Sequence, residues 1–342
     1  NGVEVLLKDN PSLQADMVVL AIGVTPDTVL AKEAGLELGI KESIVVNDRM
    51  ETSVPDIYAA GDAVQVKHYV TGNDALISLA GPANKQGRII ADNICGGDSR
   101  YLGSQGSSVI KVFDMTAATT GINETNAKKS GLEVDTVILS PMSHAGYYPG
   151  GKVMTMKVVF EKETYRLLGA QIIGYEGVDK RIDVLATAIH AGLKATQLKD
   201  LDLAYAPPYS SAKDPVNMAG FMIDNIAKGT LKQWHLEDMD KISKDKDVVL
   251  LDVRTVGEFS RGHIDGFKNI PVDELRERIS EIEKGKPVYL ICQSGLRSYI
   301  ASRILEGNGY ETYNFSGGFR FYDAVVNDRA LIERAYACGM DY

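Results

Sequence analysis

The chain has 342 residues, of which 44% are apolar and 24% are charged, and it carries a formal net charge of −9. A chain of this length can fill apolar cores in two or three domains. Its acidic balance argues against a nucleic-acid partner, which would need a basic face. Its apolar runs are far shorter than the roughly 20 residues that cross a bilayer, and residues 1–16 are too polar for a signal peptide.

The three cysteines are Cys95, Cys292 and Cys338, and they form no CxxC pair. This spacing predicts neither a disulfide framework nor a zinc site, and we assign no metal ligand. Such sparse cysteines suit a reducing compartment, so we expect a cytoplasmic protein. The sequence begins within a strand-like pattern without Met, which leads us to expect a piece of a longer protein.

The first hundred residues contain short elements divided by glycine and proline. The expected strands are Val3–Leu7, Asp16–Ile22, Ile44–Val46 and Ile57–Ala60. The expected helices are Thr28–Gly35 and Leu79–Ile94. A glycine- and serine-rich stretch at 96–108 follows, and it predicts a first domain boundary.

From Val109 onward, longer strands predict an antiparallel sheet with helices at Asn123–Ser130 and Asp179–Ala191. A second boundary is expected within Ala227–Lys232, after which strands and helices alternate as in a parallel α/β sheet. The predicted fold is therefore α/β and α+β. The expected domains are 1–104, 105–230 and 231–342.

Gly61 and Asp62 end a short strand in "TSVPDIYAAGDAV" (52–64). Glycine lets a cofactor approach the backbone, and a carboxylate accepts hydrogen bonds from sugar hydroxyls. By itself the triplet is compatible with a simple turn. Together with "ADMVVLAIGVTPDT" (15–28) and "SLAGPANKQGRIIADNI" (78–94), it resembles flavin-dependent pyridine-nucleotide disulfide oxidoreductases.

This resemblance implies that Gly61 and Asp62 contact FAD and that the backbone of Leu79 and Ala80 reaches the flavin ring. Gly23 lies in the stretch that closes the NAD(P)H-binding domain in that family. The sequence contains no GxGxxG motif and no early redox cysteine of the family, and we interpret Cys95 as a bystander thiol. We therefore expect this chain alone to retain FAD weakly and not to complete a reductase cycle.

Residues 105–228 resemble the dimerisation domain of the same family. The stretches "HAGYYPGG" (144–151) and "LAYAPPYSSAKDPVNMAG" (203–220) are most similar to the branch that reduces coenzyme A disulfide or persulfide. The resemblance implies that Tyr147 and Tyr205 reach across a homodimer toward the partner's active-site sulfur; the alternative is that both only pack. Lys180 and Arg181 could meet coenzyme A phosphates, but we favour a solvated helix face.

The last region contains "KPVYLICQSGLRSYIASRILEGNGYETYNFSGGF" (286–319), in which Cys292 follows an apolar strand and precedes a helix beginning near Ser298. Backbone N–H groups of such a loop, the helix dipole and Arg297 favour a thiolate and can hold a persulfide sulfur. The alternative is a buried structural cysteine. Four residues separate Cys292 from Arg297.

Together with "DVVLLDVRTVGEFSRGHIDGFKNIPVDEL" (247–275), this stretch resembles a single-domain rhodanese. Related phosphatases have five residues in the loop instead of four, and the shorter loop suits a single sulfur atom. Phe267 departs from the family's usual alanine at a structural turn. The other residues that match the rhodanese pattern are interpreted as structural, with ion pairs and turn contacts that hold the loop: Asp252, Arg254, Glu258 and His263.

The resemblances imply a homodimeric enzyme that uses FAD and NAD(P)H to reduce coenzyme A disulfide, persulfide or polysulfide. Cys292 and Arg297 would serve a fused rhodanese that takes sulfur from donors such as thiosulfate. Two alternatives stay open. The enzyme could be of an NADH oxidase or peroxidase kind, or the rhodanese region could be a non-catalytic sulfur-sensing or docking module.

Overall fold

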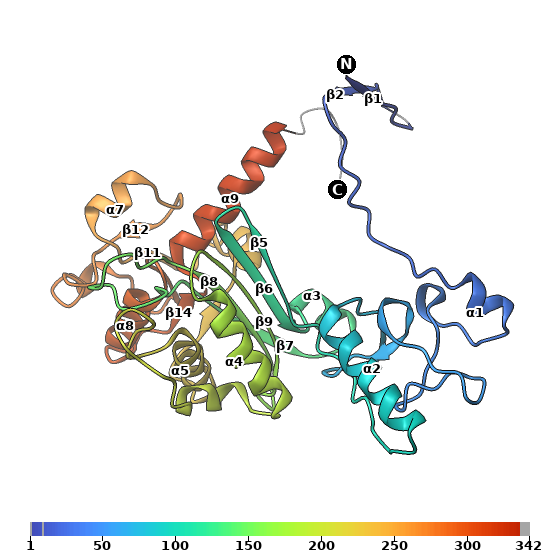
Figure 1. The fold of residues 1–342 in the computed structure, drawn as a ribbon. Coiled ribbons are helices and arrows are strands. Elements are labelled where there is room, and N and C mark those ends of the chain that lie inside the picture. The colour runs from blue at the N-terminus through green and yellow to red at the C-terminus, as the bar shows by residue number, and fades with distance from the viewer. Residues whose placement is uncertain (1, 9, 336–342) are drawn as a thin grey trace. The chain divides into compact units, whose positions relative to one another are not determined.

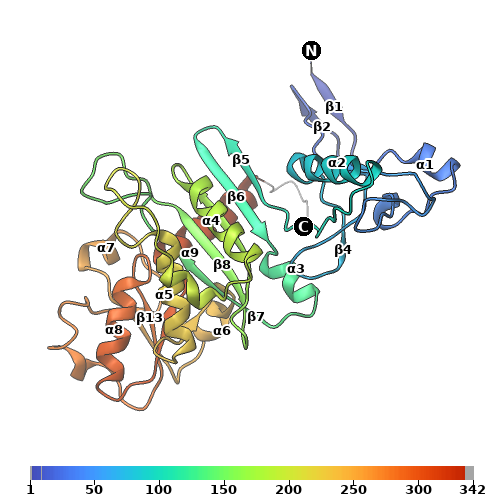
Figure 2. The same ribbon diagram turned by 60° about the horizontal axis from the view of Figure 1, so that its bottom comes forward.

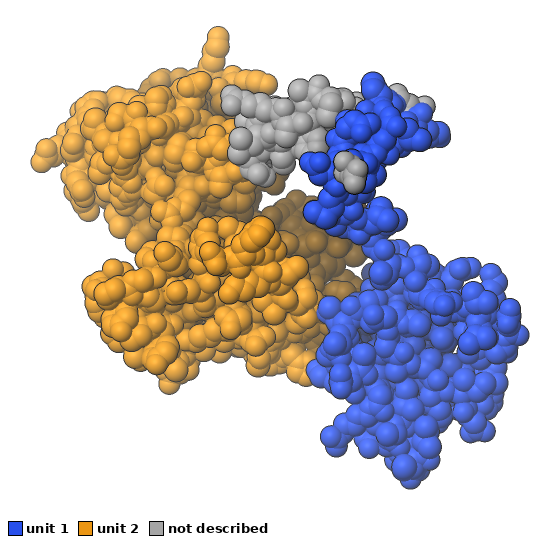
Figure 3. All heavy atoms as spheres, turned by 45° about the horizontal axis from the view of Figure 1, so that its top comes forward, with its two compact units in different colours: residues 1–67, 73–104 blue, residues 68–72, 105–342 orange. Residues whose placement is uncertain are grey.

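The computed structural model describes residues 2–8 and 10–335, so Cys338 lies outside the described residues. The chain divides into two compact units (Figure 3). Unit 1 contains residues up to 67 together with 73–104, and unit 2 contains 68–72 and the residues from 105 onward. Within the described ranges, no helix has the length and apolar character needed to cross a membrane.

Unit 1 consists of short elements around a small apolar core that includes Met50, Val64 and Val66. Its strands form two antiparallel pairs: β1 (Val3–Val5) with β2 (Leu13–Ala15), and β3 (Val66–Lys67) with β4 (Asp74–Ala75). Its helices are α1 (Val29–Glu33) and α2 (Ala80–Ile94), and its 3₁₀ turns are η1 (Ile40–Glu42) and η2 (Gly61–Ala63).

Three strand predictions in this unit are wrong. β2 ends at Ala15, and Asp16–Ile22 forms no strand, so that Ile22 is 90% exposed. Ile44–Val46 and Ile57–Ala60 form only isolated bridges. An apolar run becomes a strand only when a neighbouring strand satisfies its backbone groups over several residues. Among the described residues, 16–22 have no such neighbour, and the other two segments pair only at Ile44 and Tyr58.

The first part of unit 2 is a five-stranded sheet in the order β5-β6-β9-β8-β7, with every pair antiparallel, as predicted. The strands are β5 (Ser108–Val112), β6 (Met115–Gly121), β7 (Val134–Leu139), β8 (Thr155–Glu161) and β9 (Leu167–Gly174). The other elements are α3 (Glu124–Lys129), α4 (Val178–His190), η3 (Ala195–Asp200) and α5 (Pro215–Ala227). α4 lies along one face of the sheet against β6 and β9 (Figures 1 and 2).

The second part of unit 2 is a parallel sheet in the order β10-β14-β13-β11-β12, again as predicted. The strands are β10 (Gln233–Trp234), β11 (Val249–Asp252), β12 (Lys268–Asn269), β13 (Val288–Ile291) and β14 (Thr312–Phe315). The helices and 3₁₀ turns are η4 (Leu236–Asp238), α6 (Met239–Ile242), α7 (Val256–Arg261), η5 (Ile279–Glu281), α8 (Leu296–Glu306) and α9 (Gly318–Ala335). Phe267 is buried here and stacks on Trp234.

The two parts of unit 2 are joined along β7, the last strand of the antiparallel sheet. The Gln233 side chain donates to the carbonyl of Thr136 at 2.8 Å, and the N–H of Ile138 donates to Ser316 Oγ at 3.1 Å. Asp135 at the start of β7 accepts hydrogen bonds from Gln233 and His235. Side chains of the last region therefore bind the backbone groups that an edge strand leaves unpaired.

Candidate active sites

Cys292 follows directly after β13, at the carboxyl end of the parallel sheet. Side chains along β13 alternate between two apolar clusters, with Leu290 on one face and Ile291 on the other. Cys292 continues the alternation onto the Leu290 face and is only 1% exposed. Because ligands bind at this edge of open α/β sheets, the cysteine occupies a position suited to chemistry.

The loop formed by residues 292–297, here called the Cys292 loop, directs hydrogen-bond donors at the sulfur. The Gly295 N–H donates to Cys292 Sγ at 3.1 Å, and Ser298 Oγ lies 3.2 Å from the same sulfur. Gly295 has φ +100°, a left-handed conformation that glycine adopts without strain, and it caps α8. The donors and the amino end of α8 together stabilise negative charge on the sulfur.

The start of α9 binds two backbone carbonyls of the loop. The Phe319 N–H donates to the carbonyl of Cys292 at 2.7 Å, and the Arg320 N–H donates to the carbonyl of Gln293 at 3.1 Å. Gly318 permits this approach, since a Cβ there would lie 2.6 Å from the nitrogen of Ser294. Two helices thus begin at the Cys292 loop.

Arg297 is held by Glu258 of α7 in a bidentate ion pair, with both N–O distances 2.7 Å. The hydrogen bond from Arg297 lowers the pKa of Glu258 from its usual 4.5 to about 2. The same contact raises the pKa of Arg297, and the nearby charge of Cys292 contributes in the same direction. The positive charge at the rim of the loop is therefore largely compensated by Glu258.

The other pattern residues form the support beneath the loop. Arg254 and Asp252 are buried and form an ion pair of 2.7 Å. Arg254 also stacks over Phe319, with 3.8 Å from its guanidinium carbon to the ring centroid. The imidazole of His263 contacts the carbonyl of Phe259 and stacks on that ring.

Sequence reasoning missed Ser298 as a partner of the sulfur. Its position in the first turn of α8, six residues after Cys292, was available as a signal, because first-turn side chains face the same end of the helix as the loop.

Tyr147 and Tyr205 meet, although 58 residues separate them in the sequence. Their hydroxyl oxygens lie 2.8 Å apart, and the two side chains are 77% and 45% exposed. The hydrogen bond with Tyr147 raises the pKa of Tyr205. The two phenols are thus presented together on the surface of unit 2.

A buried arginine holds the two tyrosine-bearing loops. Arg181 of α4 is 1% exposed and pairs with Asp214 at 3.0 Å. It also donates to the carbonyls of Ser143 and Tyr209, so it ties the loop before Tyr147 to the loop after Tyr205. The favoured assignment of Arg181 to a solvated helix face is wrong, because Asp214, distant in sequence, supplies a buried counter-charge.

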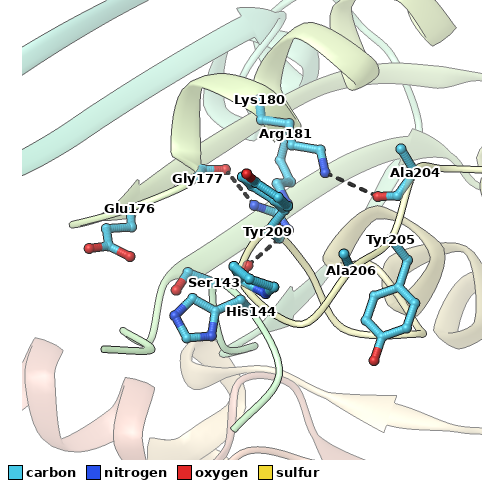
Figure 4. A pocket seen from close by; sticks show the side chains of 11 residues that line it. Ser143, His144, Glu176, Gly177, Lys180, Arg181, Ala204, Tyr205, Ala206 and Tyr209 are labelled. Atoms are coloured by element: carbon cyan, nitrogen blue, oxygen red, sulfur yellow. Dashed lines mark hydrogen bonds between the residues drawn. The ribbon is translucent and has the colours of Figure 1, made fainter. Parts of the chain in front are cut away.

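These loops border a pocket of about 520 Å³, lined by residues that include His144, Lys180, Arg181, Tyr205 and Tyr209 (Figure 4). Lys180 is partly exposed and donates to the carbonyl of Ala204 at 3.4 Å. Figure 4 shows Arg181 reaching from α4 toward the loop that carries Tyr209. Lys180 is therefore the lining cation that keeps some access to solvent.

In unit 1, four of the five residues expected to contact cofactors lie on two adjoining elements, η2 and α2. Gly61 has φ +86° and donates its N–H to the buried Gln86 of α2 at 2.8 Å, and Asp62 beside it is exposed. Leu79 and Ala80 form the amino end of α2, which has no side-chain cap. Gly23 lies apart in the segment between β2 and α1, in open space.

Three family models match the chain. The model named pyridine nucleotide-disulphide oxidoreductase matches residues 1–87, and the model of the dimerisation domain of the same family matches 107–215. A rhodanese-like domain model matches residues 235–324.

Characterised relatives agree with these matches. The NAD(P)H sulfur oxidoreductase (CoA-dependent) of Pyrococcus furiosus is 39% identical over 63% of this chain and 48% of the relative. The coenzyme A disulfide reductase of a Staphylococcus aureus strain is 35% identical over 65% of this chain and 50% of the relative. The chain therefore spans about half the length of these relatives.

Solved structures extend the likeness to nearly the whole chain. Reduced CoADR-RHD of Bacillus anthracis is 48% identical, with a TM-score of 0.92 over 95% of this chain and 58% of that one. The NAD-dependent persulfide reductase of A. fulgidus is 42% identical, with a TM-score of 0.84 over 91% of this chain and 56% of that one. We conclude that the chain contains pyridine nucleotide-disulphide oxidoreductase domains, among them a dimerisation domain, followed by a rhodanese-like domain.

Proposed function

We propose that Cys292 is the sulfur carrier of a sulfurtransferase, and that the whole protein is an NAD(P)H- and FAD-dependent reductase of coenzyme A disulfide, persulfide or polysulfide. The observation that carries the first part is the pair of donors within 3.2 Å of a sulfur at the start of α8. The names of the similar proteins support the second part. A cysteine without a disulfide in the loop suits a reducing, cytoplasmic setting.

The sulfur chemistry follows from the loop. The Cys292 thiolate attacks the outer sulfur of a donor such as thiosulfate, the sulfur–sulfur bond of the donor breaks, and sulfite leaves with the electron pair. The Gly295 N–H and Ser298 hydroxyl stabilise the anionic persulfide that results. A thiolate acceptor then attacks the terminal sulfur and releases Cys292 as thiolate.

The residues in unit 1 fit a flavin. The exposed Asp62 carboxylate suits hydroxyl groups, and the N–H groups of Ala80 and Gly81 have no acceptor among the described residues. A helix amino end of this kind stabilises the electron-rich side of a flavin ring. Bound FAD would supply two-electron transfer from NAD(P)H to a disulfide. The sequence, however, contains no GxGxxG motif to hold the flavin diphosphate. We therefore expect this chain alone to retain FAD weakly, so the purified protein should show little flavin absorbance.

The Tyr147–Tyr205 pair fits a role in a two-fold homodimer. One hydroxyl proton bridges the two phenols, and the other can be donated to a thiolate that leaves a disulfide in the partner subunit. The buried Arg181–Asp214 pair would position both loops for this purpose.

Transfer of sulfur from thiosulfate to cyanide tests the carrier role. The Cys292→Ser variant should lose this activity, whereas Cys95→Ser, which changes an exposed thiol, should keep it. If the unaltered chain transfers no sulfur, the rhodanese region is instead a sensing or docking module. The similarity to an NADH oxidase of Methanocaldococcus jannaschii, at 35% identity, makes oxygen the competing acceptor to test with a longer, flavin-loaded protein.

A further inference from the structure

A second cavity borders the Cys292 loop and has no role in the steps above. It measures about 400 Å³ and lies among α7, the Cys292 loop and the beginning of α9. Its lining is polar apart from the ring of Phe319, and it includes Gln293, Arg261, Arg320 and Asp323. We call it the arginine pocket.

The arginine pocket shares its wall with the sulfur site. Gln293 is the residue next to Cys292, and the N–H of Phe319 binds the carbonyl of Cys292 at 2.7 Å. Glu258, which also lines the pocket, holds Arg297 of the loop. A molecule in the pocket would therefore lie beside the residues that position the sulfur.

Two arginines that line the pocket form no ion pair with another described residue. Arg254 is already neutralised by Asp252, and Glu258 by Arg297. Arg261 and Arg320 are exposed, and their guanidinium groups have no ion pair within the part of the chain that the structure describes. Asp323 is the one lining carboxylate left, and it accepts a hydrogen bond from Asn327. The pocket therefore has a local excess of positive charge in a chain whose net charge is −9, and this excess favours the binding of an anion.

Resting on the proposed sulfurtransferase activity, we infer that the arginine pocket binds the anionic part of a thiol that accepts sulfur from Cys292. The class comprises thiols that carry phosphate or carboxylate groups. With its anionic part beside Arg261 and Arg320, the acceptor thiolate attacks the terminal persulfide sulfur. Cys292 leaves as thiolate, and the acceptor departs as a persulfide, so no further oxidant or reductant is needed.

The test measures the KM of each acceptor with thiosulfate at a saturating concentration. The acceptors are coenzyme A with its phosphates, glutathione with its carboxylates, and dithiothreitol, which is uncharged. In the Arg261→Gln/Arg320→Gln double variant, the KM should rise by roughly three- to tenfold for the charged thiol that the pocket recognises. This is the change expected for the loss of exposed ion pairs. Its KM for dithiothreitol and its kcat should not change.

Two further variants make the result specific. Asp323→Asn removes the opposing charge and should lower the KM of the anionic acceptor. Arg276→Gln removes an exposed arginine of the same domain that does not line the pocket, and it should change nothing. Added salt should raise the KM of the unaltered chain for the anionic thiol and affect the double variant less.

The outcomes separate this inference from the proposed function. A response to coenzyme A alone identifies a phosphorylated acceptor, and a response to glutathione alone identifies a carboxylated one. If dithiothreitol accepts sulfur normally but the double variant has the same KM as the unaltered chain for both charged thiols, the pocket is not the acceptor site. If no acceptor is persulfidated at all, the sulfurtransferase proposal itself fails.

Discussion

Ser298 has one hydroxyl proton and two acceptors within reach, the carbonyl of Gly295 at 3.1 Å and Cys292 Sγ at 3.2 Å. A neutral thiol is a weak acceptor, so the carbonyl competes well for the proton. A thiolate or an anionic persulfide attracts it more strongly. At the scale of single residues, the hydroxyl therefore responds to the charge on the sulfur, while the Gly295 N–H stays fixed.

The Ser298→Ala variant should lower the rate at which iodoacetamide alkylates Cys292 at neutral pH. The expected decrease is about three- to tenfold, the worth of one ordinary hydrogen bond. Ser302→Ala is a matched control, since Ser302 lies in the next turn of α8 and its hydroxyl binds the carbonyl of Tyr299. Equal rates in Ser298→Ala and the unaltered chain would show that the hydroxyl does not act on the sulfur.

The Arg297–Glu258 pair predicts a pH dependence. The pKa of Glu258 is lowered to about 2 from its usual 4.5, so the ionised carboxylate stabilises the folded state above pH 4.5. This contribution is lost as the pH falls from 4.5 through about 2. Urea unfolding of Glu258→Gln should therefore differ most from the unaltered chain at neutral pH, and the difference should shrink toward pH 2. A difference that grows on acidification would contradict the assignment.

At the scale of secondary structure, the sequence predicted those strands whose pattern depends on residues that are adjacent in the chain. The alternation from Val109 onward predicted an antiparallel sheet, and the buried run before Cys292 predicted a parallel strand. The run Asp16–Ile22 has an equally apolar pattern but forms no strand, because a pattern does not reveal whether a neighbouring strand is present. The burial of Arg181 was missed for the same kind of reason, since its partner Asp214 is remote in sequence.

The hydrogen bond at the edge of β7 leads to a prediction about how the two parts of unit 2 are held together. The hydroxyl of Ser316 accepts a hydrogen bond from the buried Ile138 N–H, which has no strand partner on that side. Ser316→Ala should leave this donor unsatisfied, at a cost of about 1–3 kcal/mol. Hydrogen exchange of the Ile138 amide should accelerate in this variant.

Ser260→Ala is the control for that experiment, because the Ser260 hydroxyl donates to the carbonyl of Gly257 in its own helix and does not contact β7. Unchanged exchange of Ile138 in Ser316→Ala would mean that the contact does not form in solution.

At the scale of the whole molecule, the dimerisation and rhodanese-like regions share one compact unit. The segment after β14 serves both: Ser316 binds β7, and Gly318 begins the helix that binds the Cys292 loop. The sulfur site is thus built onto the dimerisation region instead of being tethered to it by a free linker.

The role proposed for the tyrosine pair requires an assembly of two chains. We expect a two-fold dimer in which each subunit presents Tyr147 and Tyr205 to the other. Light scattering at tens of micromolar protein should give about twice the 37.1 kDa of one chain. A mass of one chain at that concentration would remove the basis for tyrosines that act across subunits.

The central claim is that Cys292 carries sulfur, and peptide mass spectrometry tests it most directly. After incubation with thiosulfate and removal of the excess, the peptide that contains Cys292 should gain the mass of one sulfur atom. Treatment with cyanide should remove it, and the peptides that contain Cys95 and Cys338 should stay unchanged. Sulfur found on Cys95 or Cys338, or an unmodified Cys292 in a protein that still transfers sulfur, would contradict the account.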